Sequence, residues 1–73
     1  MEWSMIERDW AMYQWQIRAR WGRLSDDDLR AAAGRRDQLV SVIQQRYGVA
    51  FETAQREVDG WARALERAGG SRN

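Results

Sequence analysis

The side chains that could do chemistry in this chain are few, because the residue types that carry most enzyme chemistry are missing. Among its 73 residues there is no His and no Cys, and all 12 basic residues are Arg. Acid–base and nucleophilic catalysis mostly use His, Cys or Lys, or Ser beside a base. Ser4 and Ser25 stand where helix caps are expected, and Ser71 lies in a predicted tail. We therefore predict a protein that is not an enzyme and has no small-molecule substrate.

One acidic cluster remains, formed by the consecutive residues Asp26, Asp27 and Asp28. Two carboxylates can serve a hydrolase as acid and base. However, the cluster directly follows Ser25, and acids are favoured in the first turn of a helix, where the helix dipole is positive. Asp28 also stands three residues after Ser25, the spacing of a capping box, whereas a calcium loop needs a different spacing. We predict helix capping here, and no catalytic, cofactor or metal site.

The segment from Gln14 to Arg23 contains no acid, and in it Trp15 and Trp21 are interleaved with three Arg. Such a segment suits a nucleic acid or an anionic membrane surface. The candidate anion contacts are Arg18, Arg20 and Arg23. Alternatively, these Arg complement the C-terminal end of a helix and pair with the Asp residues that follow. The net charge of only +1 does not indicate a general nucleic-acid binder, and both interpretations stay open.

The elements that must position these residues are predicted to be four helices. There is no Pro, and Gly22, Gly34 and Gly48 separate segments whose apolar residues recur at the helical period. The first runs from a Ser4 cap, with Glu7 at capping-box spacing, to about Trp21; the others run from Ser25 to near Gly34, from about Arg35 to Tyr47, and from 51 to 67.

The predicted core faces are apolar stripes on three of these helices. They contain Ile6, Trp10, Tyr13, Ile17 and Trp21 in the first helix, Leu39, Val40, Ile43 and Tyr47 in the third, and Phe51, Ala54, Val58, Trp61 and Leu65 in the fourth. The fold class is thus all-α, a compact four-helix domain over residues 1–68, with a flexible tail over 69–73. Because no Cys is present, packing alone must stabilise it, and five Trp offer much area to bury.

Trp15 does not fit the stripe of the first helix, since it lies roughly 160° away from the stripe's centre at about 100° per residue. Met5, Met12 and Ala19 lie near Trp15 on the same helical wheel. Together these four residues form a candidate interaction face, for self-association or for a protein partner. The alternative, that the strip is fortuitous or covered locally, stays open.

The string WGRLSDDDL, followed by GRRDQLVSVIQQRYG and a Val-Asp-x-Trp step from Val58 to Trp61, resembles the CsbD-like family of small bacterial general stress proteins. The resemblance covers about residues 1–66, including Trp3 and the Ile6-Glu7-x-x-Trp10 opening. It implies two packed helical hairpins, similar to a SAM domain, and expression linked to stress. It implies no established biochemical activity and no catalytic residues.

The chain departs from the family pattern at three positions. Where the family tends to have Gly in the first helix, this chain has Arg8 and Trp15, which favour the helix but add bulk to one face. Ala50 replaces a usual Ser or Thr cap, which costs the last helix about 1 kcal/mol.

No signal peptide or membrane span is recognisable, so we expect a cytoplasmic protein. Our leading hypothesis is a non-enzymatic stress-response protein that acts by self-association or partner binding. The alternative is an anion-binding accessory protein that contacts nucleic acid or acidic lipid through the Arg and Trp residues of the first helix.

Overall fold

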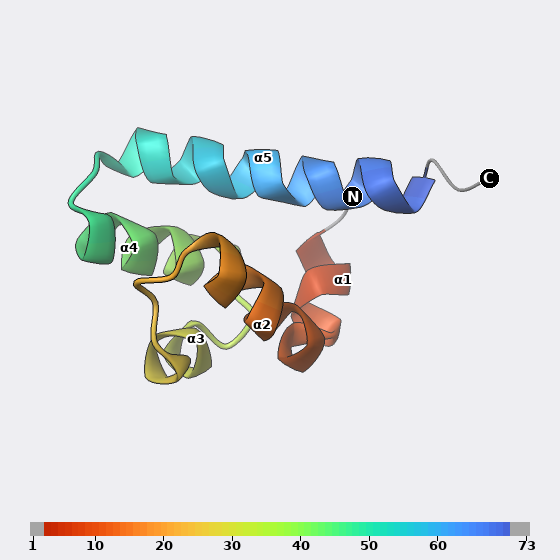
Figure 1. Ribbon diagram of the computed structural model, residues 1–73, viewed down its shortest axis with the longest axis horizontal. Helices are drawn as coiled ribbons and strands as arrows, with labels where there is room; N and C mark the ends of the chain where they lie inside the picture. The colour runs from red at the N-terminus through yellow and green to blue at the C-terminus, as the bar shows by residue number, and fades with distance from the viewer. Residues whose placement is uncertain (1–2, 71–73) are drawn as a thin grey trace.

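A computed structural model describes residues 3–70, with side chains for all of these except Glu66, Ala68, Gly69 and Gly70. The described elements are all helices, namely α1 (Trp3–Arg8), α2 (Trp10–Arg20), α3 (Asp26–Ala32), α4 (Arg36–Tyr47) and α5 (Phe51–Gly70). Figure 1 shows the long α5 along one side of the molecule, with the other four helices on the opposite side. The all-α prediction is confirmed, whereas the predicted four-helix, SAM-domain-like arrangement of two hairpins is not.

The first predicted helix is divided in two at Asp9, where the backbone has φ −106° and ψ 38°. The carbonyl of Met5 still accepts a hydrogen bond from the Asp9 amide at 3.2 Å, and the Asp9 carbonyl accepts from Met12 at 2.9 Å. The break is therefore a kink rather than a loop. Ser4 lies inside α1, which begins at Trp3, so the prediction of Ser4 as the helix cap was wrong.

Two indole hydrogen bonds hold the helices on either side of this kink against α3 and the turn that follows it. Trp3 in α1 donates to the carbonyl of Gly34 at 2.7 Å, and Trp10 in α2 donates to the carbonyl of Leu29 at 3.0 Å. Gly34 has φ +82°, and a Cβ atom there would lie 2.8 Å from Cγ of Glu7. Tertiary contacts of α1 and α2 thus set the direction of the chain near Asp9.

The predicted ends of α3 and α4 agree with the structure. The Ser25 hydroxyl accepts from the Asp28 amide, and the Asp28 carboxylate accepts from the Ser25 amide, each at 3.1 Å, so the capping box is present. Ala33 follows α3 in the left-handed conformation, with φ 53°. Gly48 ends α4 in the same conformation, with φ 65°, as expected for a glycine stop.

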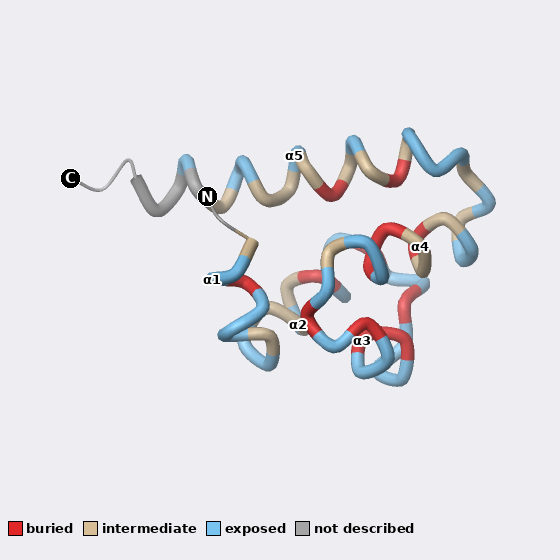
Figure 2. Tube along the Cα trace, turned by 180° about the vertical axis from the view of Figure 1, so that it is seen from behind, coloured by how far each residue is buried: buried red, intermediate tan, exposed pale blue. Residues whose placement is uncertain are grey.

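The core lies where α2, α3 and α4 meet the first half of α5 (Figure 2). Its buried side chains include Ile17, Trp21, Leu24, Leu29, Leu39, Val40, Ile43, Ala54 and Val58. Ile6 is also buried, and Trp10, Tyr13, Tyr47, Trp61 and Leu65 are half-buried. Phe51 was predicted to face inward, but it is 46% exposed because it begins α5 one turn before Ala54, the first buried residue of that helix.

The ring of Trp61 connects α5 to the N-terminal helices. Its centroid lies 6.2 Å from Trp3, 6.1 Å from Tyr13 and 5.9 Å from Trp21, and all three contacts are edge-on. Helix α5 continues to Gly70, two residues past the predicted domain boundary. Residues 71–73 of the predicted tail lie outside the described residues, so the flexibility of the tail stays a prediction.

Candidate functional site

Trp15 on α2 is the most exposed large hydrophobic side chain of the described chain, at 66%. The other four Trp all belong to the packed interior, through an indole hydrogen bond, a ring contact or both. Among the described residues, no hydrogen bond or ring partner of Trp15 is found. Packing in the folded domain therefore explains the presence of four Trp, whereas the fifth, Trp15, remains exposed to solvent.

A shallow hollow of about 380 Å³ lies beside the Trp15 ring, between α2 and the first residue of α3. We call it the Trp15 hollow; it is lined by Ala11, Gln14, Trp15, Arg18, Ala19 and Asp26. Ala11 and Ala19 stand one helical turn before and after Trp15, and their short side chains leave the indole uncovered on both sides. A large flat ring next to open space is suited to contact another molecule.

The structure brings together only part of the predicted interaction face. Trp15 and Ala19 line the hollow, and Met12 is exposed nearby on the same helix, at 48%. Met5 is also exposed, but it belongs to α1, beyond the kink at Asp9. A single straight helix was therefore the wrong basis for grouping Met5 with the other three.

Sequence reasoning missed three residues of the hollow, namely Ala11, Gln14 and Asp26. Ala11 was recognisable as a small residue four positions before Trp15, a spacing that places both on one face of a helix. Asp26 was considered as part of a helix cap, as a possible hydrolase carboxylate and as a possible partner of the Arg residues of the first helix, but not as the wall of a hollow. Its place beside α2 follows from the path of the chain between the two helices, which the sequence did not reveal.

The three candidate anion contacts have three different neighbours. Arg18 donates to Asp26 at 2.8 Å, whereas the Arg20 guanidinium lies 5.1 Å from the ring centre of Trp21 and that of Arg23 lies 5.6 Å from the ring of Tyr47. Arg18 and Arg20 are also two residues apart, which on a helix is about 200°. For Arg18 alone, the pairing with Asp26 agrees with the alternative interpretation, in which these Arg pair with the Asp residues that follow.

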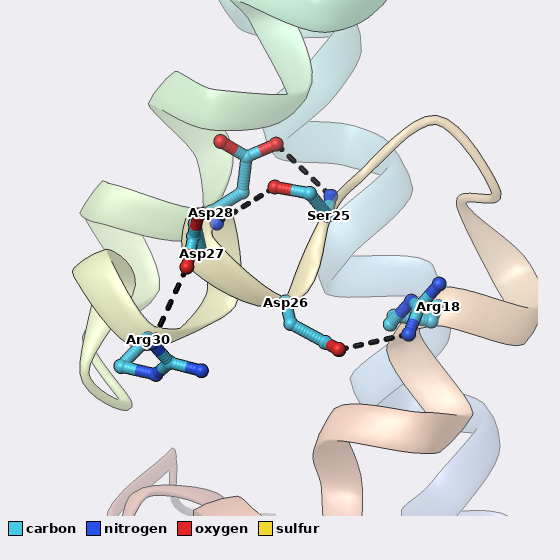
Figure 3. Close-up of polar contacts among 6 residues, drawn as sticks. All are labelled: Arg18, Ser25, Asp26, Asp27, Asp28 and Arg30. Carbon is cyan, nitrogen blue, oxygen red and sulfur yellow. Dashed lines mark hydrogen bonds and ion pairs between the residues drawn. The ribbon is translucent and has the colours of Figure 1, made fainter.

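Each carboxylate of the acidic cluster is bound to an Arg. Asp26 accepts a hydrogen bond from Arg18 on α2, and Asp27 accepts one from Arg30 of its own helix at 3.2 Å. Figure 3 shows both contacts as dashed lines. Asp28 completes the capping box and also accepts two hydrogen bonds from Arg46 of α4, at 2.7 and 2.9 Å.

These contacts determine the acidity of Asp28. The hydrogen bonds from Arg46, and then the one from the Ser25 amide, lower its pKa from 3.8 to about 2, although burial opposes the change. A carboxyl group this acidic is fully ionised at neutral pH and cannot donate a proton there. The acidic cluster thus connects helices: Asp26 joins α3 to α2, and Asp28 joins α3 to α4.

Among the side chains that the structure describes, no three acidic groups lie close enough together to hold a metal ion. No described helix combines the length and the apolar character that crossing a membrane requires.

Comparison with known proteins places the chain among small bacterial proteins. It is 43% identical over 53 residues to UPF0337 protein YjbJ of Escherichia coli O6:H1, covering 73% of this chain and 77% of that protein. It is 38% identical over 68 residues to UPF0337 protein NE2439 of Nitrosomonas europaea, covering 93% of this chain and 72% of the relative. It is 39% identical over 66 residues to UPF0337 protein RPA4217 of Rhodopseudomonas palustris, covering 90% of this chain and all of the relative.

No protein-family model and no solved structure matches the chain. The relatives are sufficient to assign the family, because the identity of about 40% extends over most of both sequences. The chain belongs to the UPF0337 family, the CsbD-like proteins.

Proposed function

We propose that this protein is not an enzyme and acts in the bacterial stress response by associating with another macromolecule through the Trp15 hollow. The observation that carries the proposal is Trp15 itself, a Trp left 66% exposed in a domain that packs its other four.

The chemistry of the described residues supports association over catalysis. The acidic cluster is engaged by Arg18, Arg30 and Arg46, and the sequence offers no His, Cys or Lys to act with it. The names of the relatives, UPF0337 proteins, state no enzymatic activity.

The energy available at Trp15 is large enough to matter for binding. A Trp buries roughly 150–250 Å² at about 25 cal/mol per Å². Since two-thirds of this side chain is still exposed, covering it contributes roughly 3 kcal/mol, about a hundredfold in affinity. Trp is also among the residue types that dominate the binding energy of protein interfaces.

The proposal is tested by crosslinking the protein inside bacteria, with and without stress, and resolving the complexes by mass. We expect stress to increase the complexes and Trp15→Ala to remove them. Phe51→Ala is the matched control, because Phe51 is another exposed aromatic residue, at 46%, at the start of α5. Complexes that persist equally in both variants would contradict the proposal.

A separate binding assay distinguishes the anion-binding alternative. If the parent and Trp15→Ala both bind DNA or acidic vesicles at low salt, and both lose this binding as salt rises, the contact is electrostatic and the hollow is not its site.

A further inference from the structure

We propose that the bend at Asp9 is a hinge, and that in a second, straight position α1 and α2 form one helix that extends the apolar face around Trp15. The structure shows the bent position, in which Trp3 holds α1 against Gly34. That the straight position serves binding rests on the proposed function, whereas the hinge itself is independent of it.

Nothing in the local sequence requires the bend. Sharp helix kinks usually occur at Pro or at paired Gly and Ser, and residues 3–20 contain no Pro and no Gly. Asp9 has φ −106° and ψ 38°, outside the helical range, and its side chain makes no capping hydrogen bond to α2. The Met12 amide donates to the carbonyl of Asp9, three residues back, where a continuous α-helix would use Arg8, four residues back. Straightening would restore the regular bonds, so local preferences favour it.

Tertiary contacts of α1 hold the bend instead. The Trp3 indole donates to the Gly34 carbonyl at 2.7 Å, and its ring meets that of Trp61 edge-on at 6.2 Å. Glu7 lies close against Gly34, since a Cβ atom on that glycine would be 2.8 Å from Cγ and 3.2 Å from Cα of Glu7. Figure 1 shows α1 turned from the start of α2 toward the second half of α5. Ile6 is fully buried but lies outside the contiguous core, so α1 can leave without opening that core.

The straight position changes which side chains share a face. Met5 precedes Met12 by seven residues and Ala19 follows it by seven, so on one helix the three lie within about 40° of each other. Trp15, three residues after Met12, lies on the neighbouring part of the same face. Met5 is 50% exposed in the bent position, so its thioether is available to extend this face. Straightening therefore lengthens the apolar strip beside Trp15 by about two helical turns.

The bent position is the more stable one in the free protein. Leaving it breaks the hydrogen bond of Trp3 and exposes Ile6, which is fully buried. A partner that binds the longer face only in the straight position would raise the population of that position. The hinge thus keeps the extended face unassembled until a partner binds.

The opening of α1 is measured by the reactivity of a single thiol, because the native sequence has no Cys. Ile6→Cys places this thiol where it is buried while α1 is bent, so an aromatic disulfide reagent reacts with it only when α1 leaves. Ile43→Cys places the thiol in the core, which becomes accessible by global unfolding. We expect Ile6→Cys to react at least about tenfold faster than Ile43→Cys, and equal rates would overturn the hinge.

The hold of Trp3 on α1 is tested in the Ile6→Cys protein, with Trp10→Phe as the matched control. Trp3→Phe removes the indole bond to Gly34 but retains an aromatic ring, and it should speed the thiol reaction by about threefold to tenfold. Trp10→Phe removes the equivalent bond to Leu29, but from α2, which does not move, so the rate should change by less than about twofold. An equal effect of the two substitutions would contradict the part assigned to Trp3.

Two substitutions at the exposed Asp9 distinguish a straight helix from an unfolded α1. Ala favours the helical conformation and Gly does not, so with a straight open state Asp9→Ala should make the Ile6→Cys thiol react about threefold faster than Asp9→Gly does. If α1 unfolds when it leaves, Asp9→Gly should give the faster reaction, because Gly weakens the helix that must unfold. That order of rates would overturn the straight position.

The crosslinking assay in stressed bacteria connects the hinge to association. We expect Asp9→Ala to increase the Trp15-dependent complexes and Asp9→Gly to decrease them. Trp15-dependent complexes that are equal in the two variants would refute the part of the hinge in binding and leave the proposed function standing. If the thiol tests succeed but no Trp15-dependent complex forms, the proposed function is refuted, and with it the use of the straight position for binding, while the hinge stands.

Discussion

Among the described residues, Asp28 is the one whose negative charge we expect to contribute most to the stability of the fold. Its side chain is only 11% exposed, and it accepts one hydrogen bond from the Ser25 amide and two from Arg46. We predict that Asp28→Asn destabilises the protein at neutral pH, because the amide can still accept from Ser25 but offers no negative charge to Arg46.

The magnitude follows from the acidity of Asp28. Lowering its pKa from 3.8 to about 2 corresponds to about 2 kcal/mol of stability, and solvent around the half-exposed Arg46 reduces this to roughly 1–2 kcal/mol. Because the pKa is lower in the folded state, this stability is present above about pH 4 and is lost as the pH falls toward 2. At neutral pH the expected decrease in Tm is roughly 5–15 °C.

Thermal unfolding of the parent and the variant, followed by circular dichroism from pH 7 to pH 2, measures this effect. Asp27→Asn is the control, since Asp27 is a neighbouring acid whose ion pair with Arg30 is almost fully exposed, and its Tm should change by at most about 3 °C. The reasoning is refuted if the two variants lose the same Tm, or if the difference between the parent and Asp28→Asn stays constant down to pH 2.

Three further predictions concern backbone positions, and chemical denaturation measures each of them. Gly34→Ala should destabilise the protein by about 1–3 kcal/mol, because the residue has φ +82° and its new Cβ would collide with Glu7; a neutral result would show that α1 can move away. Gly60→Ala should stabilise the protein by about 0.5–1 kcal/mol, since this helical position of α5 faces open space, and a loss of stability would contradict that geometry. Ala50→Ser should add about 1 kcal/mol, because the Ala50 carbonyl begins α5 without a capping side chain; an unchanged midpoint would mean that the first turn needs no cap.

Local signals in the sequence predicted much of the fold. The Ser25 and Asp28 capping box and the Gly48 stop involve residues at most three positions apart, so their chemistry is visible without knowledge of the rest of the chain. The kink at Asp9 was not predictable in this way. No Gly or Pro marks it, and the contacts that accompany it are hydrogen bonds from Trp3 and Trp10 to carbonyls 31 and 19 residues away.

The candidate site was predictable to a similar extent. The helical period alone placed Trp15 away from the core, and the structure leaves it exposed. The hollow itself depends on Asp26 lying beside α2, which requires the turn between α2 and α3 to bring the two helices together. The same turn gives Arg18 its carboxylate partner, whereas the sequence left open whether that Arg binds an external anion.

The contacts of Trp61 have a consequence for how the chain folds during synthesis. This ring touches Trp3, Tyr13 and Trp21, which the ribosome makes long before it reaches α5. Contacts between residues far apart in sequence cost loop entropy before they stabilise anything, and they tend to slow folding. The nascent chain therefore cannot complete its aromatic cluster until Trp61 has left the exit tunnel, and until then the indoles of the N-terminal helices remain available to chaperones and to other nascent chains.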